Sequence, residues 1–238
     1  MQHNIDWLPN IERLENYIRE DGTFDFVGLI KNRQNDLLND FFNTSERVLF
    51  KGLPVYLDDK ILYCDKLETK ACYNEDYYTC GQCPFDNQLD IFNHIFTTEY
   101  TNKKLKGKNG QLKVKKGFRK NGSSSIPRTP GEFCIPRALL SVWIKPIILH
   151  AFDSENVTIS PKNEKNTITL DLIHRKYRIH LKEIVAKNGF VYYVLKSAYS
   201  YTNPKELMDL ENDKYIQNAL QKRRNATSGV STTPCIDL

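Results

Sequence analysis

The sequence predicts an α+β protein: a helical N-terminal region with a cysteine-rich insert, then a C-terminal helix packed on a small antiparallel β-sheet. Apolar residues recur at helical spacing through much of residues 10–43, whereas they alternate with polar or basic residues through much of 167–200. A content of 40 % hydrophobic and 26 % charged residues is typical of a globular chain that can bury a core.

Residues 1–98 are predicted to form a mainly helical domain. Ile11, Leu14 and Ile18 predict a first helix, and a second apolar set follows through residues 37–42. Residues 47–57 predict two short strands with a turn at Gly52 to Pro54, and residues 87–100 predict another helix.

A cysteine-rich insert lies inside this region. Its pair Cys80-Gly-Gln-Cys83 has the separation and the glycine of a zinc knuckle, and the two cysteines before it are suited to complete a tetrahedral site. The predicted ligands of a structural zinc ion are Cys64, Cys72, Cys80 and Cys83, with His94 as another fourth ligand. The alternatives are unligated or buried thiols, and less readily a disulfide, which the cytosol disfavours.

Residues 99–130 form a basic, glycine-rich and lysine-rich segment, in which Tyr100 to Arg128 contain ten basic residues and no acid. The net charge of the chain is +5, so the positive charge is concentrated here. Such a segment attracts phosphate backbones, although it also has the composition of a solvated linker. The residues predicted to bind RNA are Lys103, Lys104, Lys106, Lys108, Lys113, Lys115, Lys116, Arg119 and Lys120. Residues 123–131 have the composition of a loop, and we expect the domain boundary near them.

Residues 131–225 are predicted to form a second domain. A helix over 137–151 contains Pro146, which lacks a backbone donor, so we expect a kink or two short helices. A polar connection over 153–166 follows. The sheet is then predicted as three strands at 167–174, 175–184 and 190–200, with a turn at Lys187-Asn188-Gly189, before a helix at 205–224 and a tail at 226–238.

The middle strand carries the candidate chemistry. Its alternation predicts one apolar face and one face with Arg178, His180 and Lys182. Histidine is suited to proton transfer near neutral pH, and the two cations are suited to binding phosphate. Ser197 and Tyr199 end an alternating set on the next strand and offer hydroxyls, or represent ordinary strand polarity.

Three segments carry a resemblance: Arg137 to Ile148 with its Trp-Ile-Lys-Pro, Arg175-Lys-Tyr-Arg-Ile-His-Leu, and Tyr193-Val-Leu-Lys-Ser-Ala-Tyr. Together they resemble the phage-associated branch of the barnase, EndoU, colicin and RelE-like nuclease superfamily, over about the C-terminal 95 residues. The resemblance implies a toxin-like endoribonuclease that needs no metal for catalysis, acts in phage defence or a toxin–antitoxin pair, and has an antitoxin or immunity partner. It adds Arg137 and Lys145 to the candidate catalytic residues.

Other function classes stay open. One alternative is a non-catalytic nucleic-acid-binding module built on the basic segment, and another is a protein inhibitor of phage or bacterial origin. A metal-dependent nuclease is disfavoured, because no ordered motif pairs carboxylates with histidines. The chain has no apolar run long enough to cross a membrane and no secretory signal pattern at its start, so we expect a cytoplasmic protein without a membrane partner.

Overall fold

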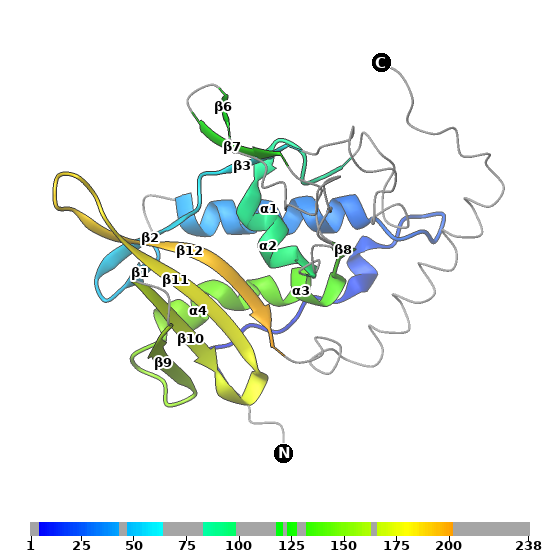
Figure 1. Cartoon of the computed structure of the whole chain (residues 1–238). Coiled ribbons are helices and arrows are strands. Elements are labelled where there is room, and N and C mark those ends of the chain that lie inside the picture. The colour runs from blue at the N-terminus through cyan, green and yellow to red at the C-terminus, as the bar shows by residue number, and fades with distance from the viewer. Residues whose placement is uncertain are drawn as a thin grey trace, which may run out of the picture.

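The computed structural model describes residues 5–42, 47–63, 83–98, 118–120, 123–127, 132–162 and 166–201 (Figure 1). These residues form a mixed α+β structure around a twisted six-stranded sheet, so the predicted fold class is confirmed at this level. The predicted helix at 205–224, the tail at 226–238 and nearly all of the cysteine-rich insert lie outside the described residues.

The strand order of the large sheet is β1-β2-β12-β11-β10-β9. Its strands are β1 (Leu49–Phe50), β2 (Leu53–Leu57), β9 (Val157–Pro161), β10 (Thr167–Leu172), β11 (Tyr177–Val185) and β12 (Val191–Ser200). All neighbours are antiparallel except β12 and β2, which pair in parallel through residues 193–195 and 55–57. The sheet therefore takes strands from both sides of the basic segment.

The predicted three-stranded meander is confirmed, but the polar connection before it is not a loop throughout. Val157 and Ile159 of β9 pair with Leu172 and Leu170 of β10, and this pairing extends the sheet by one strand. The prediction was wrong here because the two apolar residues of a short edge strand are a weak signal beside their polar neighbours. A short 3₁₀ turn, η3 (Ile173–Arg175), separates β10 from β11.

The predicted hairpin at residues 47–57 is confirmed with a shifted turn. Phe50 pairs directly with Leu53, which leaves Lys51 and Gly52 as a two-residue loop. Both loop residues have positive φ angles, 54° and 73°, as the tight turn of such a hairpin requires. Pro54 lies within β2 and pairs with Leu49, rather than ending the turn.

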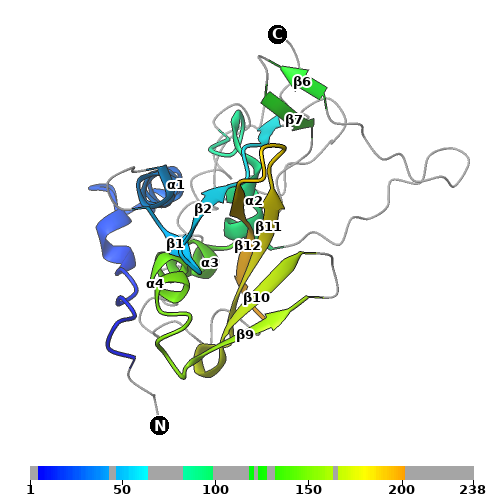
Figure 2. The same cartoon turned by 90° about the vertical axis from the view of Figure 1, so that its left-hand side faces the viewer.

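The helices α1 (Phe26–Phe42), α3 (Ile135–Leu140) and α4 (Ile144–Leu149) lie on one side of the sheet (Figure 2). The 3₁₀ turn η2 (Ser141–Trp143) separates α3 from α4. Pro146 has no N–H to donate to the carbonyl four residues earlier, so the α-helical ladder is interrupted in this turn and the two predicted short helices are confirmed. The indole of Trp143 packs edge-on against the ring of Tyr177, at 5.7 Å between centroids, and joins the helices to the core face of the sheet.

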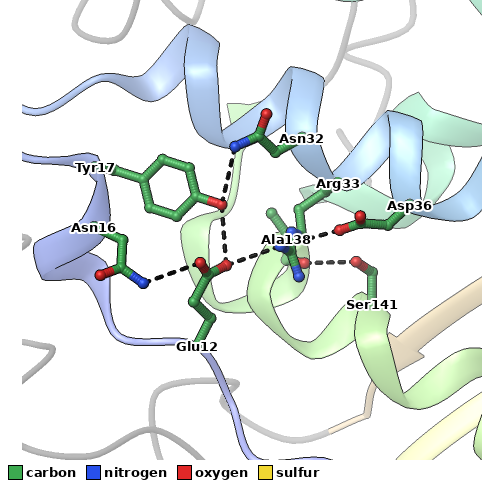
Figure 3. A network of polar contacts seen from close by, with 8 residues as sticks. All are labelled: Glu12, Asn16, Tyr17, Asn32, Arg33, Asp36, Ala138 and Ser141. Atoms are coloured by element: carbon green, nitrogen blue, oxygen red, sulfur yellow. Dashed lines mark hydrogen bonds and ion pairs between the residues drawn. The ribbon is translucent and has the colours of Figure 1, made fainter.

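The first predicted helix is reduced to one 3₁₀ turn, η1 (Leu14–Tyr17), and Ile18 instead forms a bridge with Phe24. The helical spacing was overridden by polar contacts to α1 (Figure 3). Glu12 accepts hydrogen bonds from the Tyr17 hydroxyl at 3.0 Å and from Arg33 at 2.8 Å, and Arg33 also pairs with Asp36 at 3.0 Å. Because Arg33 is buried, this network fixes the N-terminal segment against α1.

The remaining elements surround α2 (Asp90–Phe96), which lies within the predicted helical stretch 87–100. A second sheet has the order β4-β3-β7-β6, and a two-stranded sheet joins β5 to β8. The strands are β3 (Ile61–Tyr63), β4 (Gln88–Leu89), β5 (Thr97–Thr98), β6 (Phe118–Lys120), β7 (Ser123–Pro127) and β8 (Glu132–Phe133). The loop predicted from Ser123 onward was wrong for residues 123–127, because residues 123–125 pair antiparallel with β6 and residues 125–127 pair in parallel with β3.

Candidate functional site

The two faces of β11 differ as the alternation predicted. Tyr177, Ile179 and Leu181 are buried on the face that the helices cover. Arg178 and His180 lie on the opposite face, where Asp171 and Thr169 of β10 stand directly across from them. We call this second surface of β10, β11 and β12 the polar face.

A β-bulge in β12 completes the polar face. His180 pairs with Ser197, whereas Leu181 pairs with Leu195, so Lys196 is an extra residue in β12. The extra residue reverses the alternation, which puts Ser197 and Tyr199 on the polar face although Leu195 is in the core. The expectation of one alternating set through Leu195 to Tyr199 was therefore wrong.

The imidazole of His180 is hydrogen-bonded at both ring nitrogens. Nδ1 lies 3.1 Å from Oγ1 of Thr169, and Nε2 lies 3.1 Å from the hydroxyl oxygen of Tyr199. The His180 residue is only 5 % exposed, whereas Tyr199 is half-buried. One hydrogen bond therefore connects the buried imidazole of His180 to the more accessible phenol of Tyr199. Such a contact has the geometry needed to transfer a proton between the two side chains.

Two guanidinium groups lie beside Tyr199. Arg178 is directly opposite it in the β11–β12 register, and the guanidinium carbon of Arg137 lies 5.7 Å from the centre of its ring. Arg137 reaches this position from α3 while it donates a hydrogen bond to the carbonyl of Thr97. The polar face therefore carries a phenol, an imidazole and a guanidinium, and a second guanidinium reaches the phenol from α3. We call these residues the His180 cluster: Thr169, Asp171, Arg178, His180, Ser197, Tyr199 and Arg137.

Asp171 orients Arg178. It accepts two hydrogen bonds from the guanidinium, at 2.6 Å from Nε and 3.0 Å from Nη2, and these bonds raise the pKa of Arg178. The guanidinium also stacks over Tyr201, at 4.7 Å from the ring centre. Its side chain is about one-third exposed, so the remaining N–H groups can meet a ligand on the polar face.

Two predicted site residues are not part of the cluster, and one of them lies on the other side of the sheet. Lys145 on α4 pairs with Asp40 of α1 at 3.1 Å, on the helical side of the sheet. Lys182 is exposed and lies one step beyond His180 on the polar face, opposite Thr167. The structure therefore brings together Arg178, His180, Ser197, Tyr199 and Arg137, with Lys182 beside them, and separates Lys145 from them.

The predicted zinc ligands are mostly outside the described residues, which include Cys83 but not the three cysteines before it. Cys83 is half-buried, and His94 pairs with Asp90 at 3.4 Å. Within the described ranges, no group of three or more His, Cys, Asp or Glu residues is arranged to hold a metal ion. The lysines at 103–116 that are predicted to bind RNA also lie outside these ranges, whereas Arg119 and Lys120 belong to β6.

Sequence reasoning missed Thr169, Asp171 and Tyr201. The signal for the first two was present, because residues 167–172, Thr-Ile-Thr-Leu-Asp-Leu, alternate polar and apolar side chains. Antiparallel pairing of this segment with the cationic strand places those polar groups opposite Arg178 and His180. Tyr201 follows the end of β12 and has no comparable pattern.

In the part of the chain that the structure describes, no helix is long and apolar enough to cross a membrane. Comparison with known proteins found no matching family model, no similar curated protein and no similar solved structure.

Proposed function

We propose that the chain is a metal-independent, toxin-like endoribonuclease and that the His180 cluster is its active site. The observation that carries the proposal is the hydrogen bond between His180 Nε2 and the Tyr199 hydroxyl, with Arg178 across from Tyr199 in the sheet and Arg137 near its ring. Cleavage of RNA through its own 2′-hydroxyl needs a base, an acid and cations near the phosphorus, and these residue types meet that need.

In the proposed reaction, His180 accepts the 2′-hydroxyl proton through the Tyr199 hydroxyl. The 2′-oxygen attacks the adjacent phosphorus, the bond to the 5′-oxygen breaks, and that oxygen takes a proton from solvent water. The His180 imidazolium then returns its own proton to solvent. The products are a 2′,3′-cyclic phosphate and a 5′-hydroxyl. Arg178 and Arg137 bind the non-bridging phosphate oxygens as negative charge develops on them. Thr169 orients the imidazole through its hydrogen bond with Nδ1. Ser197, which is half-buried opposite His180, offers a further hydroxyl to the phosphate.

The resemblance described above supports the same reaction class for the C-terminal region. We propose accordingly that the basic segment, Lys103 to Lys120, holds the RNA backbone, and that the enzyme acts in the cytoplasm. An unregulated endoribonuclease harms the cell that makes it, so the proposal includes an antitoxin or immunity protein. The cysteine-rich insert is proposed to bind structural zinc, with no part in the chemistry.

The test is incubation with total cellular RNA in EDTA, comparing the wild type with His180→Ala and Lys31→Ala. Lys31 is an exposed residue of α1, on the helical side of the sheet, and controls for loss of a charge. The wild type and Lys31→Ala are expected to produce 2′,3′-cyclic phosphate ends, and His180→Ala to cleave at least about 100-fold more slowly. Intact RNA with folded wild-type protein, or equal cleavage by His180→Ala, would refute the proposal.

One observation favours a second function, RNA binding without cleavage. His180 is buried and both its ring nitrogens already have partners, as in a polar group that only stabilises a sheet. Under this alternative, RNA binds to the wild type and to His180→Ala with equal affinity, and no cyclic phosphate ends appear.

A further inference from the structure

Aromatic side chains cluster on the polar face at the hairpin end of β11 and β12. The ring of Phe190 stacks on that of Tyr192, with centroids 6.0 Å apart and planes 22° from parallel. Tyr56 of β2 meets Tyr192 edge-on, at 5.5 Å and 83°. We call Phe190, Tyr192 and Tyr56 the aromatic ladder.

The register of the sheet puts the aromatic ladder and the His180 cluster on the same face. Along β11, Arg178, His180, Lys182 and Ile184 alternate with residues that point toward the helices, and Ile184 pairs directly with Tyr192. Tyr56 lies between the buried core residues Val55 and Leu57, so its side chain points to the polar face as well. Ile184 is four positions after His180, and this offset corresponds to roughly 13 Å along the strand.

The ladder is partly open to solvent. Phe190 is 47 % exposed, and Tyr56 and Tyr192 are half-buried. Tyr193 and Leu195 already supply the buried contacts of β12. The three rings on the solvent side are therefore not required for the hydrophobic core of this hairpin. Exposed planar rings in a row are instead the feature on which unpaired nucleic-acid bases stack.

Positively charged side chains along the same face complement the negative charge of a phosphate backbone. Arg47 is exposed and donates a hydrogen bond to the Tyr56 hydroxyl at 3.4 Å, and Lys182 is exposed between the ladder and His180. Arg178 follows at the far end, where Arg137 approaches the Tyr199 ring from α3. Asp171, which lies across from Arg178, is neutralised by its two hydrogen bonds to that guanidinium. Cations flanking a row of rings favour a single nucleic-acid strand over an acidic peptide, which has no bases to stack.

We propose that the aromatic ladder is a base-stacking subsite for single-stranded RNA, which lies along the polar face with its scissile phosphate at the His180 cluster. The inference rests on the proposed function and makes it more specific: the substrate is unpaired at the nucleotides beside the cleaved bond. Paired bases cannot reach the rings, so the enzyme selects loops and single-stranded regions rather than duplexes.

The test uses a fluorescent 2′-O-methyl oligonucleotide of about 12 nucleotides, a length that single-strand-binding grooves accommodate. The methyl group prevents cleavage, so binding is measured separately from chemistry. Tyr192→Leu and Phe190→Leu remove one ring each and retain an apolar side chain, whereas Tyr192→Phe retains the ring. Phe152→Leu is the matched control, because Phe152 is 55 % exposed but packs on Phe50, at the edge of the core face.

Tyr192→Leu and Phe190→Leu are each expected to weaken binding about tenfold, and Tyr192→Phe and Phe152→Leu less than about twofold. A 2-aminopurine placed in the oligonucleotide is expected to lose fluorescence on binding to the wild type and to recover it in Tyr192→Leu. The same sequence as a duplex is expected to bind all variants equally. Melting temperatures equal to that of the wild type establish that the variants are folded, and Phe190→Leu at the exposed end of the ladder replaces Tyr192→Leu if the latter unfolds.

Wild-type affinity in both leucine variants would overturn the ladder proposal, as would failure of the wild type to bind the oligonucleotide. Cleavage assays separate the two proposals. Ladder-dependent binding without any cleavage by the wild type would support the subsite and refute the nuclease. Cleavage that depends on His180 but is unchanged in Tyr192→Leu and Phe190→Leu would refute the subsite and leave the nuclease standing.

Discussion

The His180 imidazole and the Tyr199 hydroxyl lie 3.1 Å apart, although their backbones are not opposite each other in the sheet. Tyr199 stands across from Arg178, and its hydroxyl reaches the imidazole two residues further along β11. The phenol is thus the more accessible end of a hydrogen-bonded chain whose other end is the buried Thr169.

Tyr199→Phe is expected to reduce RNA cleavage about 100-fold, because it removes the hydroxyl through which the proton is proposed to pass. The cost to stability is expected to be about 1 kcal/mol, the value of one hydrogen bond. Tyr193→Phe is the matched control, since the Tyr193 hydroxyl donates to Glu183 at 3.1 Å and takes no part in the His180 cluster. Equal cleavage by the two variants would show that the Tyr199 hydroxyl has no role.

Deletion of Lys196 is expected to destabilise the protein by about 3 kcal/mol or more. Without the bulge, Ser197 and Tyr199 turn toward the core and Ala198 leaves it, so polar groups are buried and apolar contacts are lost. Lys196→Ala retains the bulge and removes only a partly exposed ion pair with Asp58, so about 1 kcal/mol or less is expected. Urea denaturation measures both, and equal costs would contradict this account of the bulge.

The ion pair between Asp58 and Lys196 is expected to contribute to acid sensitivity. Burial of Asp58 opposes its ionisation, but the hydrogen bond and charge of Lys196 outweigh burial and lower the pKa of this carboxyl. Because the folded-state pKa is below the unfolded value of about 3.9, the pair stabilises the fold above that pH and the contribution is lost as the pH falls through the folded value. Unfolding free energies of the wild type and Lys196→Ala are expected to converge in acid. A difference that stays constant from pH 7 to acid would count against the assignment.

Tyr177→Phe is expected to leave stability unchanged or to raise it by up to about 1 kcal/mol. The Tyr177 hydroxyl is buried and has no hydrogen-bond partner among the described residues, and burial raises its pKa. Tyr193→Phe removes a hydroxyl that does have a partner and is expected to cost about 1 kcal/mol. Thermal or urea unfolding of the pair checks the contrast, and a larger loss in Tyr177→Phe would reveal a contact that its hydroxyl makes.

Glu12→Gln is expected to destabilise the protein by about 1–3 kcal/mol, because the buried guanidinium of Arg33 loses one of the two charged partners that it has among the described residues, Glu12 and Asp36. Glu15→Gln is the control, since Glu15 is exposed on η1, three residues after Glu12. Proteolysis of the N-terminal segment is expected to accelerate in Glu12→Gln alone. Similar stability and proteolysis in both variants would mean that the network does not hold this segment.

Local patterns in the sequence were sufficient to predict the meander, the interruption of the helix near Pro146 and the placement of Arg178 and His180 on one face of β11. Each depends on short-range geometry: strand alternation, or the missing donor of a proline. The prediction of the first helix was wrong because a long-range contact outweighed the local helical spacing. That contact joins Glu12 to Arg33, which is 21 residues away in the sequence.

Only the tertiary structure decided how the candidate site is assembled. The bulge at Lys196 brings Tyr199 to His180, and a bulge depends on how two strands fit together rather than on the residues of either strand. Arg137 reaches the cluster from α3, and Tyr56 joins the aromatic ladder through the parallel pairing of β2 with β12. The sequence by itself determined which residues carry charge and which strand faces are apolar, whereas packing between distant segments determined which of those residues meet.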